Sequence, residues 1–260
     1  WGGRNPAFLS GGTLTDDGSV QWSEPELVLF DPNPAIRMSY PDLIEQDGKF
    51  WITETQKSVA RVHPLDRALL DGLWTQAAAT NVCTGGLLLE KANSGDTPAR
   101  PSVPQTFGDL SHGGLTVELW THLDSVAAGQ ALFSTLNEAG QGVRVTTSEL
   151  AGRPTLMIEL GDGNRVAAWH TDPGVVKTGK LQHTVFICDF SSAVISVIAD
   201  GVFCDGGAVR QYGWGRIPLE LGEVKGAFHA LLAPSVKGLR LYGRALRTAE
   251  AIGNFRAGAF

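Results

Sequence analysis

The sequence has 260 residues with 27 acidic and 21 basic side chains, and its formal net charge of -6 lacks the basic character typical of nucleic-acid binding. It contains no apolar run long enough to span a membrane, so we expect a soluble chain with neither a nucleic-acid nor a membrane partner. The 32 glycines, 13 prolines and few helical periods favour an all-β fold of one large or two smaller domains. Because the first residue is Trp1 and not Met, we expect that the natural start is missing, and secretion stays open.

The N-terminal stretch is typical of two strands separated by a polar turn. Strands are expected at residues 5–10 and 26–30, and between them lies TDDGSVQW, residues 15–22. Glycine and short polar side chains favour a turn here, and we expect Trp22 to pack over it.

Residues 39–57, SYPDLIEQDGKFWITETQK, predict a hairpin whose turn is Asp47-Gly48. This dipeptide tolerates the positive φ angles of a tight turn, and the apolar residues on either side alternate as strands require. Tyr40 and Glu54 then lie on neighbouring strands and can approach each other. A third strand is expected at residues 59–63, followed by a helical turn at 66–74 with Asp66 as N-cap and Gly72 as its stop.

The rest of the chain predicts a sandwich of two antiparallel sheets. A loop without periodicity is expected at residues 92–108, and the tail predicts a helical turn capped at Thr248. The short apolar runs that indicate strands are residues 87–90, 115–122, 130–134, 142–147, 155–160, 165–170, 183–189, 193–199 and 238–242.

The cysteines and histidines predict neither a metal nor a cofactor. Cys83, Cys188 and Cys204 are too few for a disulfide framework; Cys188 and Cys204 could pair across a turn, but buried free thiols are favoured. None of the histidines has the spacing of a metal site or a catalytic triad, and we expect structural roles for His63, His112, His122, His170, His183 and His229.

Residues 77–260 resemble a laminin-G-like, concanavalin A-like jelly roll. The resemblance rests on LTVELWTHLD, HTVFICDFSSAVISVIADGVFCDGG and VKGLRLYGRALRTAEAI. Proteins of this family range from sugar binders to packing modules. Trp169, with His170 beside it, and the pair Tyr212 and Trp214 are candidate sugar-binding aromatics, although each could equally belong to the core.

Residues 1–76 resemble the C-terminal part of a sialidase-like β-propeller. Thr15, Asp17 and Trp22 match the spacing of an Asp-box turn, whereas Gly18 falls one position early. The resemblance rests also on an arginine in GGRNPAFLSGG, a tyrosine in MSYPDL and a glutamate in WITETQ, in that order along the chain.

The sialidase resemblance implies three roles. Arg4 would bind the substrate carboxylate, Tyr40 would be the nucleophile, and Glu54 would hold another arginine. Arg37 is a second candidate for the anion-binding arginine, although strand alternation predicts that it faces away from Tyr40. Each residue also has an alternative without a catalytic role: Tyr40 as a surface tyrosine, Arg4 as a solvated arginine, and Glu54 as a surface carboxylate in a cross-strand pair.

Two functions follow from these resemblances. One is the C-terminal part of a retaining glycoside hydrolase acting on an acidic sugar, completed by a propeller fragment or partner chain that supplies the base, the acid and further arginines. The alternative is a non-catalytic carbohydrate-binding protein that uses the jelly roll. A plain interaction module is the third reading.

Overall fold

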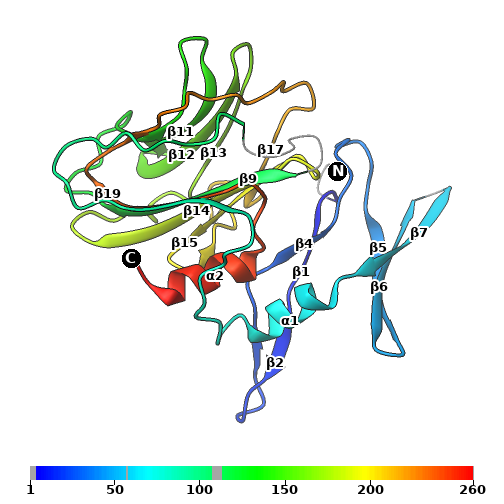
Figure 1. Ribbon diagram of the computed structural model, residues 1–260. Coiled ribbons are helices and arrows are strands. Elements are labelled where there is room, and N and C mark those ends of the chain that lie inside the picture. Colours follow the sequence, from blue (N-terminus) through cyan, green and yellow to red (C-terminus); the bar gives the residue numbers. More distant parts are fainter. Residues whose placement is uncertain (1–3, 57, 107–112, 260) are drawn as a thin grey trace.

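The computed structural model describes residues 4–56, 58–106 and 113–259, and these form a β-sandwich with a smaller N-terminal region packed beneath it (Figure 1). His112 and the end of the expected 92–108 loop lie outside the described residues. The sandwich strands are β8 (Leu87–Ala92), β9 (Gly114–His122), β10 (Ala131–Ser134), β11 (Gln141–Leu150), β12 (Arg153–Asp162), β13 (Val166–His170), β14 (Leu181–Asp189), β15 (Val194–Ala199), β16 (Val202–Phe203), β17 (Trp214–Arg216), β18 (Leu231–Leu232) and β19 (Val236–Tyr242).

The two antiparallel sheets of the sandwich confirm the predicted architecture. One has the order β13-β12-β11-β10-β18, and the other has the order β16-β15-β14-β9-β19-β8, with β17 paired to β15. The inner faces enclose the main core, which includes Val117, Phe133, Ile158 and Phe186, all fully buried. Strands β9 and β14 are buried on both faces, because helix α2 (Thr248–Ala257) covers the outer face of their sheet (Figure 1).

Helix α2 begins differently from the prediction. Its N-cap is Arg247, and Thr248 is the first helical residue. The cap comes from a distant part of the chain: the buried Glu26 carboxylate accepts hydrogen bonds from the backbone N–H groups of Thr248 and Ala249, at 2.9 and 2.8 Å. A carboxylate at a helix N-terminus compensates unpaired N–H groups and the helix dipole, so Glu26 joins the N-terminal region to the sandwich.

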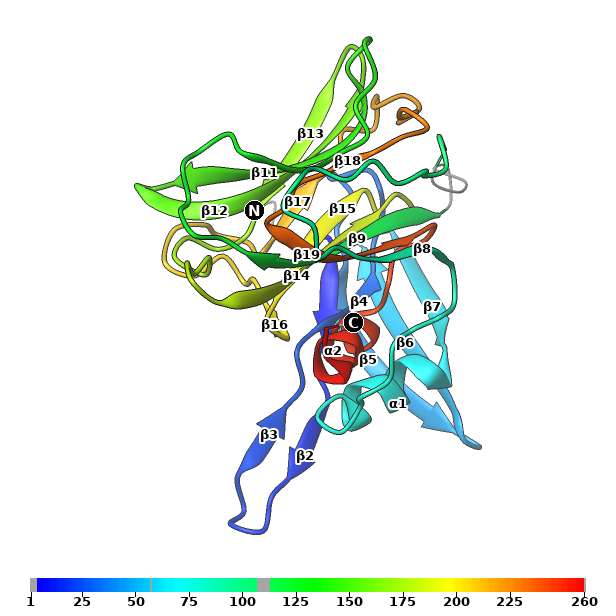
Figure 2. The same cartoon turned by 60° about the vertical axis from the view of Figure 1, so that its left-hand side comes forward.

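The described residues of the N-terminal region form seven strands and one helix. Its strands pair as β1–β4, β2–β3 and β5–β6–β7, so the described residues form no four-stranded blade. The β2–β3 hairpin extends away from the rest of the molecule (Figure 2). The elements are β1 (Ala7–Leu9), β2 (Gly12–Leu14), β3 (Val20–Trp22), β4 (Glu26–Leu29), β5 (Ser39–Gln46), β6 (Lys49–Gln56), β7 (Val59–Leu65) and α1 (Arg67–Thr75).

Two local predictions in this region are wrong. Gly72 does not stop α1, which continues to Thr75, because Gly72 lacks the positive φ of a helix stop. Its missing side chain instead lets α1 approach α2, since a Cβ there would lie 3.2 Å from Ala249 Cβ. Trp22 does not cover the turn at residues 15–19: it pairs across the hairpin with Gly12 and is 67% exposed. Asp17 closes that turn instead, and the hydroxyl of Thr15, ahead of the Ser19 groups, lowers the pKa of Asp17 to about 2.

Two further predictions concern the state of the cysteine thiols and the absence of a membrane-spanning helix in the described residues. Cys83, Cys188 and Cys204 are free thiols, with Cys188 and Cys204 buried, as the sequence favoured. Burial is the main reason that the pKa of Cys204 rises to about 12. Neither α1 nor α2, the two helices in the described ranges, is long and apolar enough to cross a membrane.

Candidate functional site

Three of the predicted site residues meet at one pocket beside the β5–β6 hairpin. The cavity has a volume of about 560 Å³, which lies within the range of small-molecule sites. We call it the Tyr40 pocket, and its lining residues are Arg4, Ala35, Arg37, Ser39, Tyr40, Thr55, Gln56 and Ser58. The described lining therefore carries two guanidinium groups and no carboxylate, although the chain as a whole is acidic.

Tyr40 occupies an unusual backbone position. The Asp47-Gly48 hairpin forms as predicted, with φ angles of 52° and 73°, but its β5–β6 register shifts between Ser39 and Asp42. At this bulge Tyr40 itself has a φ of 52°, and its side chain is 76% exposed. A non-glycine residue in the left-handed region is uncommon, and β-bulges often redirect side chains beside functional sites.

The bulge explains why Arg37 and Tyr40 share a pocket, against the prediction from strand alternation. Arg37 precedes β5, which begins at Ser39, and the left-handed Tyr40 interrupts the alternation directly afterwards. Both side chains therefore line the same cavity. Strand periodicity applies only to regular pleated backbone, which neither residue has.

Arg4 contacts the other side of the same site. Its guanidinium carbon lies 5.7 Å from the centre of the Tyr40 ring, and Nη1 donates a hydrogen bond to Ser39 Oγ at 3.2 Å. The backbone carbonyl of Arg4 accepts a hydrogen bond from Met38 N–H, which fixes its position next to the start of β5. Neither Arg4 nor Arg37 forms an ion pair with a carboxylate of the described residues, so both charges are free to bind an anion.

Gln56 adds a donor to this pocket that the sequence analysis did not identify. Its amide Nε2 is buried and has no hydrogen-bond partner in the described ranges. An unpaired buried amide is costly, and a polar ligand in the cavity would satisfy it. Such a position has no signature in sequence, because it depends on the cavity that surrounds Gln56.

Glu54 lies behind the site and does not line the pocket. Glu54 is fully buried, so the prediction that it is a surface carboxylate is wrong. It lies on the same face of β6 as the core residue Ile52. Oε1 accepts a 2.8 Å hydrogen bond from Arg61, its cross-strand partner on β7, and His63 Nε2 is 3.9 Å away. Oε2 is buried and has no partner among the residues that the structure describes.

The sandwich brings the other aromatic candidates into two small groups. Trp169 is not an open platform, because the Arg210 guanidinium lies 4.3 Å from its ring centre and a Cβ at Gly215 would lie 2.5 Å from the ring. Tyr212 stacks on Trp214, with ring centres 5.0 Å apart and an angle of 23° between the planes.

Arg216 packs against the Trp214 ring of the Tyr212–Trp214 stack. Its guanidinium carbon is 4.9 Å from the Trp214 ring, and Nη2 donates a hydrogen bond to Asn5 O at 2.5 Å. Partial burial lowers the pKa of Arg216, and Asp31 opposes this effect. Arg216 therefore contacts both the aromatic stack and the N-terminal region.

Sequence comparison identifies the sandwich. The model of the Laminin_G_3 family, described as the concanavalin A-like lectin/glucanases superfamily, matches residues 95–252. The chain belongs to this superfamily. The comparison with curated proteins gives no match.

Solved structures show distant likenesses to this concanavalin A-like chain. The CBM40 module of the Ruminococcus gnavus IT-sialidase, solved with alpha2,3 sialyllactose, has a TM-score of 0.42 at 13% identity and covers 64% of this chain and 98% of its own. The leech intramolecular trans-sialidase has a TM-score of 0.41 at 14% identity, covering 67% and 28%. Domain 4 of a GH43 arabinanase from Geobacillus stearothermophilus has a TM-score of 0.38 at 15% identity, covering 68% and 93%.

The sequence analysis also missed Arg61, the partner of Glu54 behind the Tyr40 pocket, although a signal for it exists. Gln56 pairs with Val59, and antiparallel pairing moves one residue back on β6 for each residue forward on β7. Two such steps place Arg61 opposite Glu54. The predicted third strand at residues 59–63 already contained both Arg61 and His63. Register counting would therefore have found the partner of the buried carboxylate.

Proposed function

We propose that the N-terminal region, up to about residue 76, is the C-terminal part of a sialidase-like propeller and supplies one side of a glycosidase site for an acidic sugar. The observation that carries this proposal is the meeting of Arg4, Arg37 and Tyr40 at one pocket without a carboxylate in its described lining. The concanavalin A-like sandwich then serves as an attached carbohydrate-binding domain.

The chemistry of the pocket fits a sugar that carries a carboxylate. The two guanidinium groups can each donate paired hydrogen bonds to a carboxylate, and Gln56 can bind a neighbouring oxygen. Tyr40 would attack the anomeric carbon through its phenol oxygen, forming a bond to that carbon as the glycosidic C–O bond breaks. A neutral phenol avoids the repulsion that a carboxylate nucleophile would meet from an acidic substrate.

The remaining catalytic groups would come from structure outside this sequence. A base must remove the phenol proton, and an acid must protonate the leaving oxygen. The unpaired Oε2 of Glu54 supports this division, because a buried carboxylate oxygen requires a donor and an additional arginine would supply one. Strand β5 lies at the edge of its three-stranded sheet, and the apolar side chains Leu43 and Ile44, 46% and 41% exposed, lie on its two opposite faces, so a neighbouring blade could pack beside it.

Hydrolysis of a fluorogenic sialoside by the natural polypeptide that carries this sequence tests the proposal. Tyr40→Phe should abolish turnover and leave the circular dichroism spectrum unchanged, because the exposed hydroxyl contributes little to packing. Tyr212→Phe, a matched change on the sandwich, should retain turnover. Equal turnover in wild type and Tyr40→Phe would remove Tyr40 from the mechanism.

A second candidate function is saccharide binding by the sandwich without catalysis. The stacked pair Tyr212 and Trp214 favours it, because a rigid aromatic surface next to polar groups suits the face of a sugar ring. If this function is the correct one, Trp214→Ala abolishes binding of the sialoside and Tyr40→Phe does not.

A further inference from the structure

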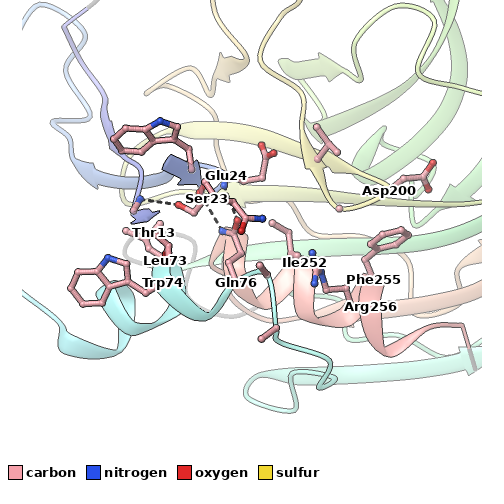
Figure 3. A pocket seen from close by; sticks show the side chains of 17 residues that line it. Thr13, Ser23, Glu24, Leu73, Trp74, Gln76, Asp200, Ile252, Phe255 and Arg256 are labelled. Atoms are coloured by element: carbon pink, nitrogen blue, oxygen red, sulfur yellow. Dashed lines mark hydrogen bonds between the residues drawn. The ribbon is translucent and has the colours of Figure 1, made fainter. Parts of the chain in front are cut away.

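A second pocket lies where the N-terminal region meets the sandwich, and no function described above uses it. We call it the junction pocket; its volume is about 460 Å³. Figure 3 shows Trp74 at one end and Asp200 with Phe255 at the other, with Gln76 and Arg256 between them. The walls come from the β2–β3 hairpin, the end of α1, the β15–β16 turn and α2, so the pocket exists only when both parts of the chain are in place.

The floor of the junction pocket is fixed by hydrogen bonds. Gln76 is 5% exposed, and its side chain binds Glu24 twice: Oε1 accepts from Glu24 N–H at 2.7 Å, and Nε2 donates to Glu24 O at 3.2 Å. Glu24 Oε2 accepts a hydrogen bond from Phe203 N–H at 2.9 Å. Both side chains are thus held in place before any ligand arrives, which reduces the entropy lost on binding.

Two indole rings flank the entrance. Trp22 is 67% exposed and Trp74 is 44% exposed, and both line the pocket. They pack against consecutive glycines: a Cβ at Gly11 would lie 3.2 Å from the Trp74 ring, and a Cβ at Gly12 would lie 3.1 Å from the Trp22 ring. Two large aromatic surfaces left open next to a polar floor are typical of ligand sites.

Free polar groups complete the site. Arg256 is exposed and has no hydrogen bond or ion pair within the described part of the chain, and Glu24 Oε1 has no hydrogen-bond partner there. Asp200 is already engaged, because its oxygens accept from His183 N–H and Gln182 Nε2. A donor and an acceptor thus face the cavity and can bind hydroxyl groups.

The charges of the junction pocket distinguish it from the Tyr40 pocket. Glu24 and Asp200 contribute two carboxylates to the lining, and Arg256 together with Lys177, which lies 3.9 Å from Asp200, balances them, so the pocket lacks the excess of positive charge that favours an anionic ligand. We infer that the junction pocket binds a neutral saccharide, which stacks on Trp74 and Trp22 and forms hydrogen bonds through its hydroxyl groups with Glu24 and Arg256. This site does not depend on the proposed function of the Tyr40 pocket.

Binding of lactose, cellobiose and xylobiose to the full chain tests the inference, with saturation-transfer NMR and acrylamide quenching of tryptophan fluorescence as readouts. We expect at least one of these disaccharides to bind with a Kd of about 1 mM and to protect tryptophan from quenching. Trp74→Ala should weaken this binding by about tenfold or more, as for other aromatic anchors. Arg256→Ala, a change at an exposed position that does not threaten folding, should also weaken it.

Phe228 provides the matched control, because it is an aromatic residue that is 55% exposed and does not line the pocket. Phe228→Ala should bind the disaccharide as wild type does. Absence of binding for all three disaccharides at about 50 mM would overturn the inference. Equal binding by wild type, Trp74→Ala and Arg256→Ala would overturn it as well. So would tighter binding of methyl glucuronide than of methyl glucoside, because the junction pocket has no excess of positive charge that would favour the acid.

Discussion

The guanidinium of Arg4 lies 5.7 Å from the centre of the Tyr40 ring, and the same side chain donates a hydrogen bond to Ser39. A cation over an exposed aromatic ring contributes only about 0.5–1 kcal/mol, so this contact does not hold the fold together. Its consequence is geometric: a residue from before β1 and a residue at the β5 bulge are kept at one cavity. Arg37 reaches the same cavity from the segment that leads into β5.

Glu54→Gln should separate stability from function. The amide can still accept the Arg61 hydrogen bond, and it removes a buried charge whose second oxygen has no partner in the described structure. We therefore expect the free energy of unfolding, measured with urea, to change by less than about 1 kcal/mol. In the natural polypeptide the same change should lower turnover of the sialoside, because the amide no longer carries the charge that pairs with an added arginine.

Arg61→Gln is the companion variant for this prediction. It removes the partner of Glu54 that the chain itself supplies and leaves both carboxylate oxygens without an ionic partner except His63. We expect a larger loss of stability than for Glu54→Gln. A larger loss of stability for Glu54→Gln than for Arg61→Gln would show that Oε2 of Glu54 is not an unsatisfied charge.

The buried ion pair under α2 should make a large contribution to stability. Glu118 is fully buried and binds Arg240 at 2.7 Å, His183 at 3.1 Å and Asn254 of α2 at 2.6 Å. Glu118→Ala should lower the free energy of unfolding by about 3 kcal/mol, because the remaining groups stay in an apolar environment. Glu90 is the matched control: it binds the same Arg240 but is 45% exposed, so Glu90→Ala should cost less than about 1 kcal/mol.

Glu118 should also make stability depend on acid pH. Burial opposes its charge, but His183, Arg240 and Asn254 outweigh burial and hold the pKa of Glu118 below its ordinary value of 4.5. A lowered folded pKa gives stability that is complete above pH 4.5 and is lost as the pH falls through the folded pKa. The stability advantage of wild type over Glu118→Gln should therefore shrink in urea titrations below pH 4.5. An advantage that stays constant with pH would contradict this assignment.

The sequence predicted the features that depend on neighbours along the chain. Asp47-Gly48 forms its hairpin turn, and Asp66 caps α1 by accepting a hydrogen bond from Ala68 N–H. The long sandwich strands follow from apolar runs that need no knowledge of their partners. The three-residue strand β17 at Trp214–Arg216 was missed, because it is too short to show a period and forms only by pairing with β15.

The features that sequence reasoning could not supply depend on contacts between distant segments. Glu26 caps a helix 222 residues later, and no local pattern marks a strand glutamate for that role. Arg37 was placed on the wrong face because the bulge at Tyr40 breaks the alternation on which the prediction relied. The junction pocket requires α1, α2 and the β2–β3 hairpin together, so neither tryptophan alone indicated a site.

The most direct test of the central claim compares binding of methyl α-N-acetylneuraminide with binding of its carboxylate methyl ester. If Arg4 and Arg37 form an anion site, the acid should bind about tenfold or more tightly than the ester, by titration calorimetry or NMR. Arg37→Ala should remove this preference, whereas Arg100→Ala, a change at an exposed arginine in the 93–106 loop, should retain it. Equal affinity for acid and ester, or a preference that survives Arg37→Ala, would contradict the account.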